Sequence, residues 1–413
     1  MIKFERLRIM KNNEKLLDHL QQINRDRRPD LLMWKYRAMR ENAFRFFRAT
    51  PSLFYQNMHP ELMADAYPVC WSCGDLHLEN FGSFRGSNKL VYFDINDFDE
   101  ALLAPATVDL TRLVASLFVA APLLRHSPET SRQLAYRFLT TYRQLLLLSK
   151  PRSIERQTSK GILNEFLTQV ARRSRKELIN RLTHGHGRKR QLRLIKDRIL
   201  PLPKQEREVV WSWLKSALAE GADYRLRDVK FRMAGTSSIG LNRYVALVES
   251  ASHKLHLLDI KATRSSVAEP YLNVSQPCWP NPANRIVALQ NRLQDVPPAN
   301  LWPLVGLDGE FFAVRSLQPQ ADRLDLTNKR IRGKQRLGKL IDTMAQLTAS
   351  AHLRSGGHQG SAIADELITF ANKTVWVSEL VAWAEAYAQQ VFLDFDQFQA
   401  AFDAGWPGSI ECK

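Results

Sequence analysis

An apolar segment at residues 89–95, KLVYFDI, has polar side chains before it and at its end. The run CGDLHLENFGSF ahead of it contains Asp75 and Asn80, and the run FDINDFDEA at its end contains Asp94 and Asp97. Oxygen ligands gathered around one strand are costly to desolvate unless a cation compensates them, and Mg²⁺ prefers such oxygens. The pattern therefore predicts a divalent-metal site, with magnesium as the expected ion.

The spacing of these residues resembles the catalytic loop and metal-binding segment of protein-kinase-like phosphotransferases, particularly the aminoglycoside and choline kinase branch. That branch shows G-D-x-H-x-x-N, a strand, and then I-D-[FW]-[ED]. The resemblance implies that Asp75 is the catalytic base and that Asn80 and Asp97 hold magnesium. Asp94 is the alternative to Asp97. Asp97 is preferred because Asp109 follows it by twelve residues, the interval to a structural aspartate in choline-kinase-like chains. Asp109 is then expected to brace the catalytic loop.

A second group of residues, further along the chain, points to phosphate binding. From about residue 229, VKFRMAGTSSIGLNRYVALVE predicts a strand, a turn and a second strand, and KLHLLDIKA predicts a third strand ending at Lys261. Backbone N–H groups and hydroxyls of such a turn can bind phosphate, and a lysine at a strand end supplies a point charge for it. This order resembles the nucleotide-binding lobe of kinases, which implies that the turn and Lys261 contact the phosphates of ATP. The turn residues are Gly235, Thr236, Ser237, Ser238 and Gly240.

In that resemblance the lysine pairs with a glutamate on the next helix. The helix expected at 282–295 has no glutamate, which leaves Glu269 and Gln290 as the alternative partners of Lys261. A strand is expected at 310–317, and Gln318-Pro319 after it suits a hinge at which backbone groups bind adenine. Further helices are expected within 5–50 and at 108–121, 132–148, 334–354 and 363–402.

The catalytic loop precedes the nucleotide-binding segment here, whereas ordinary kinases have the opposite order. A circular permutation reconciles the two, because exposed loops tolerate new termini. The expected fold is α+β: a two-lobed, circularly permuted protein-kinase-like fold with a mainly helical large lobe and a small antiparallel-sheet lobe. Residues 1–220 are expected to form a helical lobe with the catalytic and metal-binding loop, 221–320 the β-rich nucleotide-binding lobe, and 321–413 the helices that complete the large lobe.

The chain also resembles the bacterial domain-of-unknown-function family 2252 from about residue 33 to 390. The matching stretches are FFRAT, CGDLHLENFGSF, FDINDFDEA, VDLTRLVASL, the pair GTSSIGLNRY and DIKA, and AHLRSG. Members of that family commonly carry a glutamate directly after the strand lysine, where this chain has Ala262. The family name implies no activity.

The formal net charge is +17, and a surplus of this size attracts polyanions. Much of it lies in 172–198, which predicts a solvated two-helix hairpin with a loop at His184 to Gly187. The alternative is a patch that binds an acidic partner or nucleic acid, although no aromatic residues interleave as single-strand binding requires. No apolar run approaches the ~20 residues of a membrane span, and the start MIKFERLRIM has no secretory signal, so a cytoplasmic location is expected.

Two smaller features lie next to the expected catalytic loop. Cys70 and Cys73 form an isolated CxxC, which predicts buried thiols rather than a zinc or redox site. Arg48 is expected to cap a helix end, with an anion contact at the loop as the alternative.

The sequence thus predicts an ATP- and Mg²⁺-dependent phosphotransferase that acts on the hydroxyl of an unidentified small molecule or protein. The same residues would also suit the transfer of a nucleotidyl group. Two other classes stay open. One is a catalytically silent kinase-like module that binds nucleic acid or another polyanion through 172–198. The other is a metal-dependent hydrolase, which would need neither Lys261 nor the glycine turn.

Overall fold

Helix α5 (Thr107–Val119) lies inside the fold and is buried along its whole length in the computed structural model, which describes residues 13–63, 66–318 and 324–408. Its sequence, TVDLTRLVASLFV, leaves no continuous polar face, which is typical of a helix without solvent contact. The prediction of a central helix at 108–121 is confirmed. Arg112 is the one cation in this helix, and it has no exposed surface.

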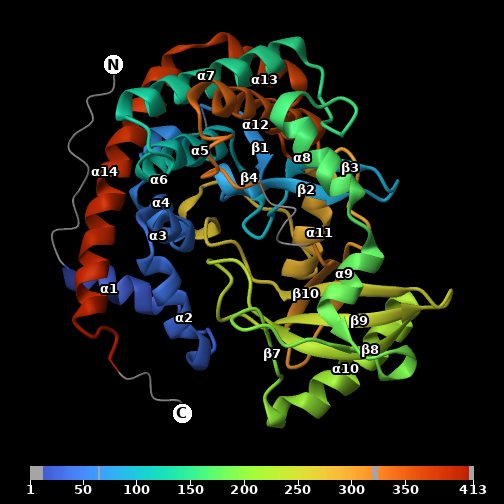
Figure 1. The fold of residues 1–413 in the computed structure, drawn as a ribbon. Helices are drawn as coiled ribbons and strands as arrows, with labels where there is room; N and C mark the ends of the chain where they lie inside the picture. Colours follow the sequence, from blue (N-terminus) through green and yellow to red (C-terminus); the bar gives the residue numbers. More distant parts are fainter. Residues whose placement is uncertain (1–12, 64–65, 319–323, 409–413) are drawn as a thin grey trace.

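The two ends of the chain build one helical body around α5. Figure 1 shows the blue and teal helices beside the orange and red ones, and α12 packs on α7 while α14 packs on α5. The buried apolar side chains of this body form a single cluster. Its helices are α1 (Asn13–Gln22), α2 (Pro29–Arg40), α3 (Ala43–Ala49), α4 (Pro51–Asn57), α6 (Ala121–Leu124), α7 (Pro128–Leu148), α8 (Gly161–Arg172), α12 (Lys334–Arg354), α13 (Ala364–Asn372) and α14 (Val375–Asp403).

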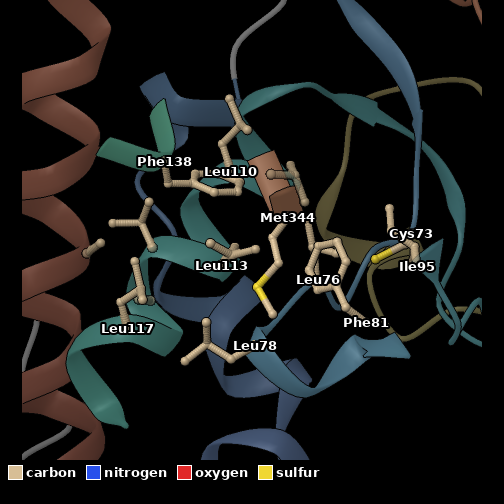
Figure 2. Packing of buried hydrophobic residues seen from close by; sticks show 14 of the residues in the cluster. Cys73, Leu76, Leu78, Phe81, Ile95, Leu110, Leu113, Leu117, Phe138 and Met344 are labelled. Atoms are coloured by element: carbon tan, nitrogen blue, oxygen red, sulfur yellow. The ribbon is translucent and has the colours of Figure 1, made fainter. Parts of the chain in front are cut away.

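Two short antiparallel ribbons carry the acidic segments on this body. Strand β1 (Val69–Ser72) pairs with β4 (Leu102–Pro105), and β2 (Phe81–Arg85) pairs with β3 (Val91–Ile95). Strand β3 is the apolar strand predicted at 89–95. The loop between β1 and β2 is anchored by Leu76 and Leu78, which Figure 2 shows among Leu113 of α5 and Met344 of α12. Apolar residues therefore alternate with the polar residues of this loop and fix it to the core.

A six-stranded antiparallel sheet forms the second part of the fold (Figure 1). Neighbouring residues of a strand face opposite sides of the sheet. Side chains such as Ala246 and Ile260 pack with α10 (Lys204–Ala222) on one face, while Val245 and Leu257 pack with α9 (Arg175–Leu182) on the other. The strands, in sheet order, are β11 (Trp302–Val305), β12 (Phe311–Ser316), β10 (Leu255–Ala262), β9 (Arg243–Ser250), β8 (Tyr224–Arg232) and β7 (Ile199–Leu200).

The mixed α+β class with antiparallel sheets is as expected, and so are the strand–turn–strand–strand series β8–β9–β10 and helix α12. Helix α11 (Pro282–Leu293) also forms where a helix was expected, and it contacts α12 as well as β11 and β12. Among the described residues, none of the helices combines the length and apolarity that crossing a bilayer requires.

The described part of 5–50 forms helices as expected, and Asn42 accepts a hydrogen bond from the N–H of Arg45 at 2.9 Å and starts α3 as a separate helix after α2. One local prediction is wrong. Residues 172–198 do not form a two-helix hairpin. After α9 the chain pairs β5 (Thr183–His184) with β6 (Gln191–Leu192), with Gly185 and Gly187 at positive φ between them. Residues 5–12 and Pro319 of the expected hinge lie outside the described residues.

Candidate active site

The loop at 73–80 is held from the start of α5. The two carboxylate oxygens of Asp109 accept the backbone N–H groups of Cys73 and Gly74 at 2.9 and 3.0 Å. The hydroxyl of Tyr55 donates to the carbonyl of Gly74. Gly74 has φ +78°, and a Cβ there would overlap the carbonyl of Glu100, so only glycine fits. Asp109 therefore has the bracing geometry expected of it, and both Cys70 and Cys73 are buried as predicted.

Asp75 is fixed by a buried arginine. Its Oδ1 accepts the Nε–H of Arg112 at 2.8 Å, and Arg112 also donates to the carbonyl of Phe47 at 2.8 Å. The guanidinium stacks 3.5 Å from the centre of the Phe47 ring. Burial raises the pKa of Asp75 to about 6 even though Arg112 lowers it. One carboxylate oxygen is thus committed to Arg112, which leaves Oδ2 for the pocket and keeps the group ionised at neutral pH.

Asn80 joins the loop to the end of β3. Its Nδ2 donates to the carbonyl of Asp75 at 2.6 Å, and its own carbonyl accepts the N–H of Asn96 at 2.8 Å. The amide oxygen of Asn80 is thereby left as an acceptor beside the pocket. Asp97 is solvent-exposed within the same pocket. The side chain is partly desolvated by the protein around the pocket, which disfavours its charge, but the positive charges of Lys261 and Arg315 outweigh this and lower the pKa of Asp97.

Asp94, the alternative to Asp97, lies elsewhere. It is buried, its Oδ1 accepts the N–H of Ile95 at 2.8 Å, and its Oδ2 lies 3.8 Å from Arg354. It is not among the residues that line the pocket, whereas Asp75, Asn80 and Asp97 are. Of the two aspartates considered as metal ligands from the sequence, Asp97 therefore lines the pocket and Asp94 does not.

Lys261 comes from the sheet and meets the acidic segment. It is 7% exposed on β10, and its ammonium donates to a carboxylate oxygen of Asp99, two residues after Asp97. The ion-pair partner is therefore neither of the residues considered from the sequence. Glu269 lies exposed on the short helix η4 (Glu269–Tyr271), and the side chain of Gln290 donates to Gln294 at 3.3 Å.

The same face of the sheet carries a charge cluster next to Lys261. Asp259, two residues earlier on β10, accepts from Arg243 at 2.8 and 2.6 Å and forms salt bridges with Arg232 at 2.7 Å and Arg315 at 3.4 Å. Three guanidinium groups surround one carboxylate here, and the charges of Arg315 and Arg243 reach Asp97 and lower its pKa, so a surplus of positive charge lies beside the pocket. Such a surplus suits a polyanionic ligand such as a triphosphate.

The glycine turn between β8 and β9 forms another wall. Ser237 and Ser238 line the pocket. Gly235 and Gly240 bend the turn with φ angles of +79° and +92°, a conformation that L side chains rarely adopt. Thr236 is buried in the turn. The turn predicted to bind phosphate therefore lies in the same pocket as Asp75 and Asp97.

The donor set fits a magnesium ion that is completed by a ligand. Among the described residues, no three His, Cys, Asp or Glu side chains are grouped so that they alone could hold a metal. Magnesium bound with a nucleotide needs fewer, because it takes one or two carboxylates together with phosphates and water. Asn80 and Asp97 supply a protein share of that size.

Three residues of this site were missed from the sequence. Asp99 pairs with Lys261, Arg112 fixes Asp75, and Arg285 of α11 donates to the backbone carbonyls of Asp99, Ala101 and Arg264. Arg112 had a usable signal, since it is the one cation in the apolar sequence of α5. Asp99 belongs to the acidic run after the apolar strand, but its pairing with Lys261, like the contacts of Arg285, depends on the fold.

Arg48 also contacts the loop directly. It lies 3.2 Å from the Nε2 of His77 and pairs with the carboxylate of Glu79. This contact replaces the helix-end capping that the sequence favoured, and it holds the second half of the loop against α3.

The chain matches no curated protein and no solved structure. The model of a family described as an uncharacterized protein conserved in bacteria (DUF2252) matches residues 27–401, and the chain therefore belongs to this family.

Proposed function

We propose that the chain is an ATP- and Mg²⁺-dependent phosphotransferase with a circularly permuted protein-kinase-like fold. The ion pair between Lys261 and Asp99 carries this proposal, because it joins the sheet to the acidic segment at the edge of the pocket, which Asp99 itself lines. A lysine from a strand, a carboxylate base and a metal-ligand pair around a glycine turn are the parts that phosphoryl transfer from ATP uses.

Each group then has a defined task. Asp75 accepts the proton of the acceptor hydroxyl through the oxygen that Arg112 leaves free. The acceptor oxygen forms a bond to the γ-phosphorus of ATP while the bond from that phosphorus to the β,γ-bridging oxygen breaks, and ADP leaves. Lys261 and the turn at 235–240 contact the phosphates. Positioning of the reactants and electrostatic stabilisation supply the rate enhancement.

Asn80 and Asp97 would hold the magnesium ion, which when bound neutralises charge on the phosphates. In this arrangement the six-stranded sheet with α9 and α10 is the nucleotide-binding lobe, and the helical body around α5 is the large lobe, so the sheet lobe begins before residue 221.

Titration calorimetry of the full chain with ATP and Mg²⁺ tests the nucleotide site. We expect Asp97→Asn to weaken binding of the magnesium nucleotide at least tenfold. Asp94→Asn serves as the matched control, because Asp94 lies in the strand that Asp97 follows but is not part of the pocket lining. Equal affinities of the two variants, or no nucleotide binding by the wild type, contradict the proposal.

Turnover measurements test the chemistry. Asp75→Asn should bind the magnesium nucleotide as the wild type does and lose phosphoryl transfer. Labels on the α- and γ-phosphates separate nucleotidyl from phosphoryl transfer. A metal-dependent hydrolase would instead be insensitive to Lys261→Met, with Lys254→Met at the exposed β9–β10 turn as the control.

The silent polyanion-binding module is the weaker candidate. In the structure several basic residues of 172–198 bind other protein groups: Arg175 contacts His256 at 3.1 Å, and Arg190 donates to Asn180 at 3.2 Å. Salt-sensitive nucleic-acid binding that survives Asp97→Asn and is lost when Arg188 and Lys189 are neutralised would favour it.

A further inference from the structure

Three cations line a wall of the pocket that the phosphotransfer chemistry above does not use. Arg27 precedes α2, Lys35 lies within α2, and Arg264 follows β10. Arg27 and Arg264 are close enough that both charges lower the pKa of Lys35, which burial lowers first. The three side chains therefore form one cluster, although they come from distant parts of the chain.

The hydrogen bonds of this cluster go to neutral oxygens. Arg27 donates to the carbonyl of Ile239 at 2.7 Å, Lys35 to the amide oxygen of Asn24 at 2.6 Å, and Arg264 to a backbone carbonyl at 2.5 Å. Within the described ranges, no carboxylate forms a salt bridge with any of the three cations.

Lys35 is buried without a salt-bridge partner, whereas Arg264 is exposed and Arg27 is half-buried and faces the charges of Glu100 and Asp99. Lys35 is 1% exposed, and the Nε of Arg27 is buried with no hydrogen-bond partner. Burial lowers the pKa of Arg27 to about 10. A buried cation without a paired anion is costly, and the charges of Arg27 and Arg264 add to the cost at Lys35, so an anionic ligand at this cluster would be stabilising.

The cluster and Asp75 line the same pocket, to which helices α3 and α4 contribute Ala49, Pro51 and Ser52. Figure 1 shows α2 reaching from the helical body towards the loops of the sheet, and the N–H of Arg28 donates to the carbonyl of Gly240 at 2.9 Å. A molecule whose hydroxyl faces Asp75 can thus place an anionic group against these cations.

We propose that the acceptor is a hydroxyl compound that already carries a phosphate monoester, and that Arg27, Lys35 and Arg264 bind this phosphate. The charge favours phosphate over a carboxylate, because three cations match a group of charge about −2 better than one of −1. The hydroxyl of Ser265, which lines the same pocket, adds a donor for a phosphate oxygen. This assignment of the acceptor rests on the proposed phosphotransfer.

Inorganic phosphate is the probe. Calorimetry of the full chain, saturated with Mg²⁺ and a non-hydrolysable ATP analogue, should show one phosphate bound per chain. Lys35→Met should weaken phosphate binding at least tenfold and leave the affinity for the analogue within about twofold. The variant should fold, because methionine fills the buried site without an unpaired charge. Arg264→Gln, at an exposed position, is the second variant, and Lys254→Met is the control for loss of one positive charge.

The outcomes separate this inference from the proposed function. Phosphate binding that is absent, unchanged in both variants, or matched equally by acetate overturns the phosphate site. Loss of analogue affinity in Lys35→Met assigns the cluster to the nucleotide and also overturns it. If the analogue fails to bind the wild type while phosphate still binds through Lys35, the phosphotransferase proposal falls and the anion site stands.

Discussion

Replacement of Asp259 by asparagine should destabilise the fold strongly. The Asp259 side chain is 2% exposed and is the counter-charge for Arg232, Arg243 and Arg315. Removing one partner of a buried ion pair costs about 3–5 kcal/mol, since the remaining charge stays buried and unpaired. Asparagine keeps one acceptor oxygen, which places the expected loss near the lower end, at about 3 kcal/mol.

The matched control is Asp403→Asn. Asp403 forms the same two-point contact with Arg40, at 2.5 and 2.7 Å, but the two side chains are 47% and 43% exposed. Exposed pairs contribute about 0–1 kcal/mol because water screens them. The two substitutions change the same atoms, so the difference between them measures the effect of burial.

Urea denaturation at pH 7, followed by tryptophan fluorescence, provides the assay. With a slope of roughly 3 kcal/mol per molar urea, a loss of about 3 kcal/mol lowers the midpoint by about 1 M. Positive neighbours hold the pKa of Asp259 well below its usual value despite its burial. A depressed pKa gives stability that is present above the unfolded value near 4 and lost as the pH falls through the folded pKa. The difference between wild type and variant should therefore be constant from pH 5 to 8. A midpoint shift no larger than that of Asp403→Asn would refute the reasoning.

Three further outcomes follow from the site. The pKa of Asp75 is near 6, so kcat/KM should be level above pH 7 and fall about tenfold per pH unit below about pH 5.5. A profile that stays level down to pH 4.5 would exclude Asp75 as the base. Burial raises the pKa of Glu100 to about 7, so the folded protein holds a proton there that the unfolded chain loses near pH 4.5. The free energy of unfolding should therefore decline as the pH rises from about 4.5 to 7, and Glu100→Gln should remove that decline in urea titrations at pH 5 and 8. Asp109→Asn leaves one of the N–H groups of Cys73 and Gly74 without an acceptor and should cost about 1–3 kcal/mol of unfolding free energy, whereas a loss below about 0.5 kcal/mol would show that the brace is dispensable.

Local pattern was enough to predict much of the secondary structure. The long periodic segment 334–354 is helix α12 with the expected bounds, and the strands expected at 229–262 form as β8, β9 and β10, although β9 and β10 are buried on both faces and do not alternate. Short elements escaped, since β1 and β4 have four residues each and their stability comes from pairing with each other. The hairpin after α9 escaped because its two-residue strands carry no periodicity.

The sequence predicted those residues of the site that lie close together along the chain. Asp75 and Asn80 stand out because they follow one glycine within a loop. The partner of Lys261 was not predictable, since Asp99 lies 162 residues away and only the packing of β10 against the acidic segment brings them together. Lys35 gave no sign of its role, because a lysine in an amphipathic helix is normally solvent-exposed and this one is buried.

The titrating groups of the pocket are perturbed in a consistent way. Burial raises the pKa values of Asp75 and Glu100 and lowers those of Lys35 and Arg27, so each of these groups is less stable in its charged form than it would be in water. Core packing alone would favour apolar residues of similar volume at such positions. A cation beside the carboxylates and an anion beside the lysine would relieve the strain on both sides at once. A ligand with a metal at one end and a phosphate at the other has that distribution of charge. The charged groups of the pocket are already desolvated in the free protein, so binding of this ligand does not have to supply that part of the desolvation energy.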